Sequence, residues 1–440
     1  MGRAVTGVVW ATVYLLAAIV PLFFMLVGDP PPGRGWLVDT SIALGFIGLA
    51  MLGLQFANTA RVNAVDASYG QDVVLQFHRE ISFVAMAFVL AHPILLFVDD
   101  PERLGLLNVI EAPWRARFGV ASVVLLLVIA ATSLWRQQLR LRYEVWRVLH
   151  GVLAFAIVVT ALLHVELVGY YVSGPWRRGL WIVWSVVLVG LLVKVRIVNP
   201  WQMRRRPWTV AGVDELPGGS WHLRLRPEGH DGIDVQPGQF AWITLGRSPF
   251  QIREHPFSFS SSADGDGELR FTIKEAGDFT SQLGELEPGT RAYVDGPYGA
   301  FSYERAQAEG FVFLAGGIGI SPMLSMLRTL ADRGDRRPMW LFYANPAWDD
   351  IAIRDELDEL AGRLDLEVVL VLEDPPDDWS GGTGFISGEM LDEHLPAAAA
   401  ARYQYFVCGP GAMMDAVEEL LLDRGVDHGH IALERFDFID

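Results

Sequence analysis

The sequence contains a single cysteine, Cys408, among its 440 residues. One thiol excludes a disulfide within the chain and any iron–sulfur cluster held by four cysteines. Basic residues are outnumbered by acidic ones, and the formal net charge is −17. Such a chain does not neutralise phosphates in bulk, so no nucleic-acid partner is expected. Any electron carrier in this protein must therefore be held by something other than a set of four thiolates.

Long apolar runs, in contrast, fill the first 200 residues. Each run has roughly the 20 residues with which an α-helix crosses a bilayer core of about 30 Å. A cleaved signal peptide is the alternative for the first run, but five more runs follow it and it is longer than an ordinary signal segment. Six membrane spans are therefore predicted, at 5–27, 37–58, 73–98, 116–135, 145–171 and 178–198.

Basic residues beside the spans predict the orientation. The loops after the second, fourth and sixth spans contain Arg61, WRQQLRLRYEVWR and KVRIVNPWQMRRR, whereas the loop after the third opens with DDPE. Basic charge marks the cytoplasmic side of a membrane protein. An even number of spans puts both ends on one side, so we expect a multi-pass protein of the cell membrane whose C-terminal half is cytoplasmic.

Two of the apolar runs carry a histidine pair at one spacing. The pair is His78 and His92 in FHREISFVAMAFVLAH, and His150 and His164 in VLHGVLAFAIVVTALLH. Fourteen residues turn a helix by about 1400°, some 40° short of four turns, and rise about 21 Å. Each pair therefore lies on one helix face. Because both spans run outward, the helices offer an inner pair, His78 with His150, and an outer pair, His92 with His164.

An imidazole inside a membrane is unfavourable unless it has a partner, so each histidine is a candidate functional residue. A lone histidine could simply hydrogen-bond a neighbouring helix, but identical spacing in two helices argues against that reading. Zinc would need four ligands at one point rather than two pairs about 21 Å apart. Two b-type haems, each with one axial histidine from each helix, fit the pattern.

The second half has the pattern of a soluble protein. Segments such as WHLRLRP, FAWITLG and ELRFTIKEAG predict a small antiparallel β-barrel. FVFLAGGIGISPMLSMLRTLADRG then indicates a strand, a glycine-rich turn and an amphipathic helix, and further strands alternate with helices, which predicts a parallel sheet. The predicted multidomain membrane protein has a six-span transmembrane domain at 1–200, a β-barrel at 203–305 and an α/β domain at 306–440.

Glycines open the helix after the first α/β strand. Gly316, Gly317 and Gly319 leave backbone N–H groups that could receive a pyrophosphate, although a structural turn explains a lone GGxG nearly as well. In the same order the chain contains HPFSFSS at 255–261, GDFTSQL at 277–283, GPYG at 296–299 and CGPGAMM at 408–414. These motifs resemble those of the ferredoxin–NADP reductase superfamily. Together with the histidine-bearing helices, they make the sequence similar to the ferric reductase and NADPH oxidase family.

The resemblance implies an FAD site and a nicotinamide nucleotide site. The residues expected against the isoalloxazine and ribityl chain are His255, Pro256, Phe257 and Ser258, and those expected at the diphosphate are Lys274, Gly277 and Thr280. The residues expected at the nicotinamide nucleotide are Gly316, Gly317, Gly319, Ser321, Pro322, Gly409 and Pro410. Cys408 is expected near the nicotinamide C4, with a small core residue as the alternative, and Phe436, or else Phe438, over the flavin.

One position departs from the family pattern. Pro346 follows Tyr343, Ala344 and Asn345, where the resemblance leads us to expect a basic residue in a strict NADPH user. NADPH and NADH therefore both stay open as the electron donor.

These patterns predict a transmembrane flavohaem oxidoreductase. Electrons from cytoplasmic NAD(P)H are expected to pass through FAD, which converts a two-electron hydride into single electrons, and through two haems to an external acceptor. Dioxygen, giving superoxide, is the favoured acceptor, with a ferric chelate or an external protein as alternatives; no obligatory protein partner is evident. A nucleotide-sensing membrane protein without redox activity is the alternative from another class, and it predicts no haem absorption.

Overall fold

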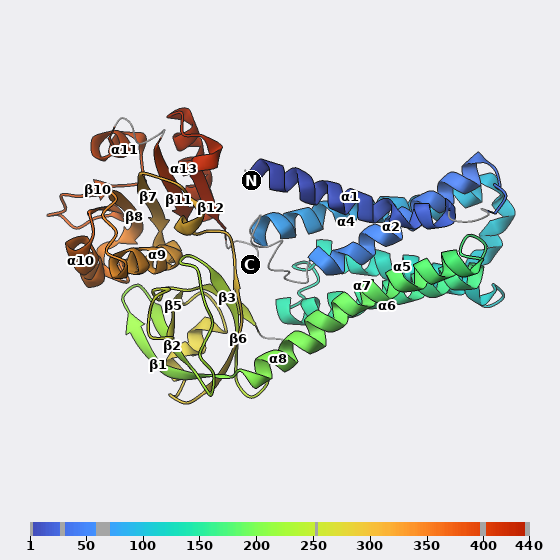
Figure 1. The fold of residues 1–440 in the computed structure, drawn as a ribbon, viewed down its shortest axis with the longest axis horizontal. Coiled ribbons are helices and arrows are strands. Elements are labelled where there is room, and N and C mark those ends of the chain that lie inside the picture. Colours follow the sequence, from blue (N-terminus) through green and yellow to red (C-terminus); the bar gives the residue numbers. More distant parts are fainter. Residues whose placement is uncertain (1–2, 27–30, 59–70, 251–253, 397–401, 436–440) are drawn as a thin grey trace. The chain divides into compact units, whose positions relative to one another are not determined.

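The chain folds into two compact units, each of which is described separately. The computed structural model describes residues 3–26, 31–58, 71–250, 254–396 and 402–435. One unit is helical and extends to Val198, and residues 199–440 make up most of the other. Figure 1 shows the first unit in blue to green and the second in green to red.

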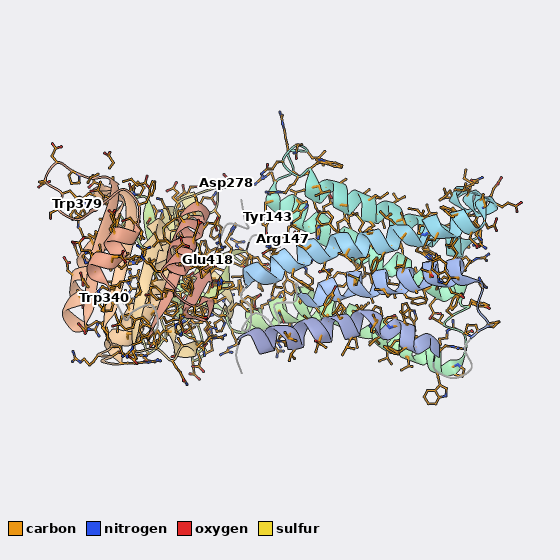
Figure 2. All side chains as sticks on the ribbon, turned by 90° about the horizontal axis from the view of Figure 1, so that it is seen from above. Tyr143, Arg147, Asp278, Trp340, Trp379 and Glu418 are labelled. Atoms are coloured by element: carbon orange, nitrogen blue, oxygen red, sulfur yellow. The ribbon has the colours of Figure 1, made fainter. Side chains whose placement is uncertain are left out.

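Six long apolar helices build the helical unit. They are α1 (Arg3–Leu26), α2 (Trp36–Asn58), α4 (Gln71–Asp99), α5 (Trp114–Leu134), α6 (Tyr143–Val168) and α7 (Pro175–Val193). The side chains along them are mostly carbon (Figure 2). Within the described residues, five helices are long and apolar enough to cross a membrane, and the apolar part of α1, Val8–Phe24, is shorter. The chain is thus a multi-pass membrane protein, while the sixth span stays a prediction.

Local chemistry explains where two of the helices differ from the predicted spans. Helix α6 ends at Val168 rather than 171, because Gly169 adopts φ 66° and closes the helix with a left-handed cap. Helix α7 begins at Pro175 rather than 178, because proline suits the first helical position, where its missing N–H has no partner to lose. A π-helical turn, Lys194–Val198, and a short helix, α8 (Asn199–Arg205), follow α7.

Apolar clusters hold the long helices together, and one of them joins Ala18 of α1, Met51 of α2 and Ala85 of α4. Phe46 and Leu49 of α2 pack against Trp181 of α7. Leu126 and Ile129 of α5 pack against Leu153 and Ile157 of α6. The last of these clusters fixes α6, which carries His150 and His164, against α5.

The first part of the soluble unit is a six-stranded antiparallel barrel. Its strands are β1 (Trp208–Leu216), β2 (Ser220–Pro227), β3 (Phe240–Leu245), β4 (His255–Ser258), β5 (Leu269–Lys274) and β6 (Arg291–Tyr298), in the order β4-β3-β6-β1-β2-β5. A bridge between Phe259 and Phe271 joins the two ends of this order. The predicted antiparallel sheet is therefore present, and its edge strand β4 begins at the HPFS motif.

The second part is a parallel six-stranded sheet. Its strands are β7 (Gly310–Gly316), β8 (Met339–Ala347), β9 (Leu366–Asp374), β10 (Gly382–Thr383), β11 (Tyr403–Cys408) and β12 (Ile431–Glu434), in the order β10-β9-β8-β7-β11-β12. The order reverses between β7 and β11, which are neighbours. In open parallel sheets, ligands bind beyond the carboxyl ends of the strands at such a reversal.

Helices cover both faces of this sheet, as its apolar strands require. They are α9 (Ile320–Asp332) and α10 (Arg354–Arg363) on one face, and α11 (Gly388–His394) and α13 (Gly411–Asp423) on the other. Successive residues of β7 alternate between the two: Phe311 and Phe313 pack with the first pair of helices, and Val312 and Leu314 with the second. The predicted parallel sheet with crossover helices is confirmed.

Candidate functional site

The four histidines of α4 and α6 form two facing pairs. The ring centres of His78 and His150 are 6.3 Å apart, and those of His92 and His164 are also 6.3 Å apart. A ligating imidazole nitrogen lies about 2 Å from a transition metal and its ring centre about 1 Å further, so two axial rings on one metal are centred about 6 Å apart. Both pairs therefore have the ring-centre separation that is expected of two imidazoles that bind one metal.

In the inner pair, each Nδ1 faces a side-chain oxygen. His78 Nδ1 donates to Gln55 Oε1 at 2.7 Å. His150 Nδ1 lies 3.2 Å from Ser133 Oγ, and this hydroxyl donates its own proton to Ile129 O at 2.7 Å. Because the serine proton is already used, Ser133 Oγ can only accept from His150. Both inner histidines thus carry their proton on Nδ1 and keep the Nε2 lone pair for a ligand.

In the outer pair, main-chain carbonyls play the same part. His92 Nδ1 donates to Ser41 O at 3.0 Å, and His164 Nδ1 donates to Arg115 O at 2.6 Å. Ser41 Oγ donates to His92 O at 2.7 Å, so its oxygen also accepts from His92 Nδ1, at 3.0 Å. A carbonyl can only accept, so the outer histidines also present Nε2. Ligating histidines usually have such a second partner, which orients the ring and raises its basicity.

Two glycines make room for the outer rings. A Cβ on Gly45 of α2 would lie 3.1 Å from His92 Cγ, and a Cβ on Gly119 of α5 would lie 2.9 Å from His164 Nδ1. Either carbon would push on the imidazole. These glycines and the Nδ1 partners were not predicted from the sequence, where only a polar or small residue inside an apolar run could have indicated them.

The four histidines are arranged as two separate pairs and not as one cluster. Across the residues that the structure describes, no group of three or more His, Cys, Asp or Glu side chains could hold a metal ion. A pair of imidazoles on opposite sides of one metal suits a metal whose other ligands come from a macrocycle. The donor set therefore fits a haem in each pair.

The HPFS motif lies on the edge strand of the barrel. His255, Pro256 and Phe257 are half-buried and Ser258 is buried, and β4 pairs with β3 at one end of the strand order. The His255 ring stacks on Phe279 with ring centres 4.0 Å apart, and Phe257 lies parallel to Phe279 at 6.0 Å. One side of β4 therefore offers backbone donors and acceptors beside aromatic rings, which fits a flat polar ring system such as isoalloxazine.

The predicted diphosphate segment is a turn organised by Thr280. Its Oγ1 accepts from the backbone N–H groups of Ala276 and Gly277, at 2.8 and 3.0 Å. The side chain of Thr280 thus shapes the turn, while a Cβ on Gly277 would meet open space. Lys274, at the end of β5, pairs with Ser220 and is half-buried.

The two glycine-rich loops meet at the carboxyl ends of β7 and β11. A Cβ on Gly319 would lie 2.3 Å from Cys408 O, and one on Gly316 would lie 2.8 Å from Pro410 Cδ. Gly409 packs just as closely, since its Cβ would be 3.0 Å from Gly316 Cα. Gly317 has φ +51° and open space beside it. Close approach therefore explains three of the glycines, and Gly317 leaves backbone accessible where the strand order reverses.

Cys408 is the last residue of β11, between Ala315 of β7 and Glu434 of β12. It is 1% exposed, so it is part of the packed sheet as well as adjacent to both loops. Pro322 is buried in the first turn of α9, and Ser321 Oγ donates to Thr272 O of the barrel at 2.7 Å. The hydroxyl of Ser321 thus joins the barrel to the parallel sheet.

Further polar residues of α9 continue this junction. Ser325 Oγ donates to Ser261 O at 2.7 Å, Thr329 Oγ1 accepts from Ala263 N at 2.9 Å, and Arg328 Nη1 donates to Ser260 O. Spacings of three and four residues place them along one helix face. This stripe was not predicted from the sequence, although its spacing within an otherwise apolar helix is a signal that the sequence contains.

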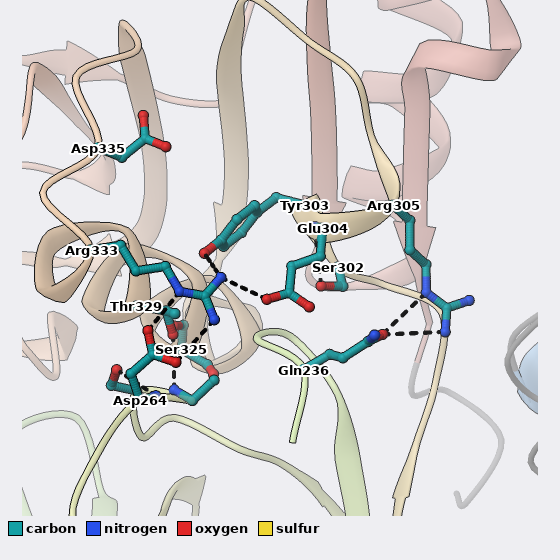
Figure 3. Close-up of polar contacts among 12 residues, drawn as sticks. Gln236, Asp264, Ser302, Tyr303, Glu304, Arg305, Ser325, Thr329, Arg333 and Asp335 are labelled. Carbon is teal, nitrogen blue, oxygen red and sulfur yellow. Dashed lines mark hydrogen bonds and ion pairs between the residues drawn. The ribbon is translucent and has the colours of Figure 1, made fainter. Parts of the chain in front are cut away.

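Arg333, which follows α9, closes the junction at the surface (Figure 3). It donates to both carboxylate oxygens of Asp264, at 2.6 and 3.0 Å, and to Glu304 Oε1 at 2.6 Å. The hydrogen bonds with Arg333 lower the pKa of the Asp264 carboxyl below its usual value. Barrel and sheet are therefore fastened along the length of α9, from Ser321 in its first turn to Arg333 just after its end.

The end of β8 and the segment after it offer little positive charge. Pro346 is exposed, and Arg354 lies 4.3 Å above the Trp348 ring. Arg328 donates to both oxygens of Glu356, at 2.5 and 2.6 Å, and is 9% exposed. Its guanidinium is therefore engaged by Glu356 and is poorly placed to bind a 2′-phosphate. Phe436 and Phe438, the residues expected over the flavin, lie outside the described residues.

Three family matches cover most of the chain. Residues 44–161 match the ferric reductase like transmembrane component, residues 222–302 an FAD-binding domain, and residues 313–419 an oxidoreductase NAD-binding domain. The motif residues from His255 to Thr280 fall in the second match, and the glycine loops in the third.

Similar proteins match a little over a third of the chain. NADH-cytochrome b5 reductase 1 of Mortierella alpina is 33% identical over 172 residues, or 38% of this chain and 57% of the relative. NADH–cytochrome b5 reductase 1 of Arabidopsis thaliana is 36% identical over 156 residues, or 35% of this chain and 55% of the relative. The chain thus spans a little over half the length of these relatives.

Among solved structures, the ferredoxin reductase in carbazole 1,9a-dioxygenase is 26% identical, with a TM-score of 0.46 over 52% of this chain and 69% of that chain. The flavohemoglobin of Malassezia yamatoensis is 17% identical, with a TM-score of 0.49 over 92% of this chain and 99% of that chain. From its three matched domains and their order, the chain has the ferric reductase/NADPH oxidase-like architecture, a transmembrane domain followed by FAD-binding and NAD-binding oxidoreductase domains.

Proposed function

We propose that this protein carries electrons from cytoplasmic NAD(P)H across the cell membrane to an acceptor on the outer face. Dioxygen is the proposed acceptor, which makes the chain a superoxide-producing oxidase. A ferric chelate is the second candidate, favoured by the match of residues 44–161 to a ferric reductase like component. An external protein is the third. The proposal includes six membrane spans and two haems.

The cofactors supply the electron-transfer chemistry, and the chain supplies the residues that would bind them. When bound, FAD accepts a hydride and releases single electrons, and two b-type haems carry single electrons through the bilayer. His78 and His150 would hold the inner haem, and His92 and His164 the outer one. The edge strand at His255–Ser258 and the turn at Lys274, Gly277 and Thr280 would hold FAD.

The chain orients the nucleotide at the two glycine loops. Gly316, Gly317, Gly319, Gly409 and Pro410 would bind it, with Pro322 in the first turn of α9 and Ser321 anchoring that helix to the barrel. Because Ser321, Ser325, Arg328 and Arg333 fasten α9 to the barrel, the nucleotide loop keeps a fixed position relative to β4. Fixed geometry of this kind favours direct hydride transfer.

The observation that carries the proposal is the shared geometry of the histidine pairs. Both have a ring-centre separation of 6.3 Å, and all four Nδ1 atoms have oxygen partners. A merely structural role for the four histidines does not explain two pairs with the same separation and an oxygen partner at every Nδ1 atom. A nucleotide sensor without redox activity does not account for this arrangement.

NADH is a suitable donor as well as NADPH. Two relatives of this chain are named NADH-cytochrome b5 reductase 1. Discrimination in favour of NADPH needs donors for the 2′-phosphate, and arginine supplies these best. Arg328 is bound to Glu356, and acidic Asp349 and Asp350 precede Arg354.

The deciding experiment is an optical spectrum of the detergent-purified protein before and after anaerobic NADH or NADPH. We expect b-type haem bands that sharpen on reduction, with two haems and one FAD per chain. Replacing His92 or His164 by alanine should remove one haem and stop reduction of the external acceptor, while NAD(P)H still bleaches the flavin. A purified protein without haem bands would refute the proposal and favour the nucleotide sensor.

A further inference from the structure

The inner and outer histidine pairs are held by different kinds of oxygen. Side chains accept from the inner pair, namely Gln55 Oε1 at 2.7 Å and Ser133 Oγ at 3.2 Å. Main-chain carbonyls accept from the outer pair, namely Ser41 O at 3.0 Å and Arg115 O at 2.6 Å. A main-chain carbonyl survives every side-chain substitution. The inner site, in contrast, depends on which residues occupy positions 55 and 133.

The two inner acceptors are unequal. Gln55 offers an amide carbonyl oxygen at the shorter distance and is 6% exposed. Ser133 offers a hydroxyl oxygen, which also accepts from Trp146 Nε1 at 3.3 Å. A hydrogen bond is stronger in surroundings of low dielectric constant. His78 therefore has the stronger partner, and Gln55 has the larger influence on the inner site.

An acceptor on Nδ1–H acts on the metal through the ring. It orients the imidazole and makes Nε2 more basic. A more basic axial ligand stabilises the oxidised iron, and hydrogen bonding around the ligands is one means by which proteins tune haem. Removal of the acceptor should therefore make the site easier to reduce, and a negatively charged acceptor should make it harder.

We propose that Gln55 is a positioning residue that orients His78 and sets the reduction potential of the inner haem, with Ser133 making a smaller contribution through His150. This inference rests on the proposed function, because it needs a haem between the inner histidines. It goes beyond that function by assigning control of one haem to a residue that touches neither the haem iron nor a substrate.

The test is a potentiometric titration of the haem bands in the full-length protein, with EPR spectra of the oxidised form. The variants are Gln55→Met, which keeps the length but lacks the acceptor, and Gln55→Glu, which adds charge to it. The component that persists in His92→Ala identifies the inner haem. Ser122→Ala is the matched control, because buried Ser122 donates its hydrogen bond to Ile157 O, at 3.2 Å between α5 and α6, and not to a histidine.

The expected result is a higher midpoint for the inner component in Gln55→Met and a lower one in Gln55→Glu, with altered EPR g-values and an unchanged outer component. Ser133→Ala should raise the same component by less, and it tests the inference if either Gln55 variant fails to fold. Ser122→Ala should leave both midpoints unchanged. Two haems with wild-type midpoints in all variants would overturn the inference alone, whereas a wild-type protein without haem would overturn the proposed function.

Discussion

The substitution Gly119→Ala tests the outer histidine pair with one carbon atom. The added Cβ would lie 2.9 Å from His164 Nδ1, whereas ordinary contacts of a Cβ begin at 3.4 Å. The ring must therefore move by 3.4 minus 2.9, or about 0.5 Å, whereas metal–ligand distances in real sites stay within about 0.2 Å of their standard values. We expect His164 to lose its place as an axial ligand.

Two other glycines give a graded comparison. A Cβ on Gly45 would lie 3.1 Å from His92 Cγ, so the required shift is 3.4 minus 3.1, or about 0.3 Å. A Cβ on Gly190, inside α7, would meet nothing within 4 Å. Glycine to alanine inside a helix otherwise stabilises by up to about 1 kcal/mol, so Gly190→Ala should be neutral or slightly stabilising.

The assay is haem content per chain together with the low-spin signature of bis-histidine ligation. The perturbation should be largest in Gly119→Ala, smaller in Gly45→Ala and absent in Gly190→Ala, with the inner haem unaffected in all three. Flavin reduction by NADH should persist throughout. An outer haem with wild-type content and spectrum in Gly119→Ala would refute the close packing of this glycine against a ligating His164.

Three more predictions concern the soluble unit. NADH should support turnover within about tenfold of NADPH, a difference below about 1.4 kcal/mol, and a hundredfold preference for NADPH in kcat/KM would reveal a basic residue that closes over the site. A chain ending at Arg435 keeps the 2.6 Å ion pair of Arg435 with Asp415. It should have the Tm of the full chain but an altered nucleotide affinity and rate of hydride transfer. An unchanged rate of hydride transfer would mean that Phe436 is not part of the flavin site. The pKa of Asp264 is lowered by its hydrogen bonds with Arg333, so its stabilising effect is present above the unfolded value of about 3.9 and is lost as the pH falls through the lower folded value. The Tm difference between wild type and Asp264→Asn should therefore be constant from pH 7 to 5 and shrink below pH 4. A difference that is constant down to pH 3 would show that the ion pair of Asp264 with Arg333 does not stabilise the folded protein.

The histidine pairs were predictable because a period is visible within one helix. His78 and His92, like His150 and His164, are 14 residues apart, and helix geometry alone places each pair on one face. The partners of their Nδ1 atoms lie 17 to 51 residues away on other helices. Pairing over such separations depends on how helices pack, which no local pattern encodes.

In the soluble unit, too, local patterns could be predicted from the sequence and contacts between distant segments could not. Alternating apolar segments and the turn at Gly316–Gly319 predicted the barrel, the parallel sheet and the glycine loop. The close approach of Gly319 to Cys408 was hidden, because the two loops are about 90 residues apart and meet only once β7 and β11 pair. The polar stripe of α9 was missed for a different reason: Ser321 and Ser325 lie in an apolar helix, and a serine there can equally bond back to its own helix.

The 14-residue spacing of the histidines also connects the proposed electron path to the membrane voltage. A rise of about 21 Å covers roughly 0.7 of a hydrocarbon core of about 30 Å. One charge that crosses the whole core changes in energy by about 2.3 kcal/mol per 100 mV, so one electron that passes between the two pairs exchanges about 1.6 kcal/mol with the field per 100 mV. In the proposed orientation a negative cytoplasm drives this step outward. Turnover is then an electric current that depolarises the membrane, and sustained activity requires cations to leave the cell alongside the electrons.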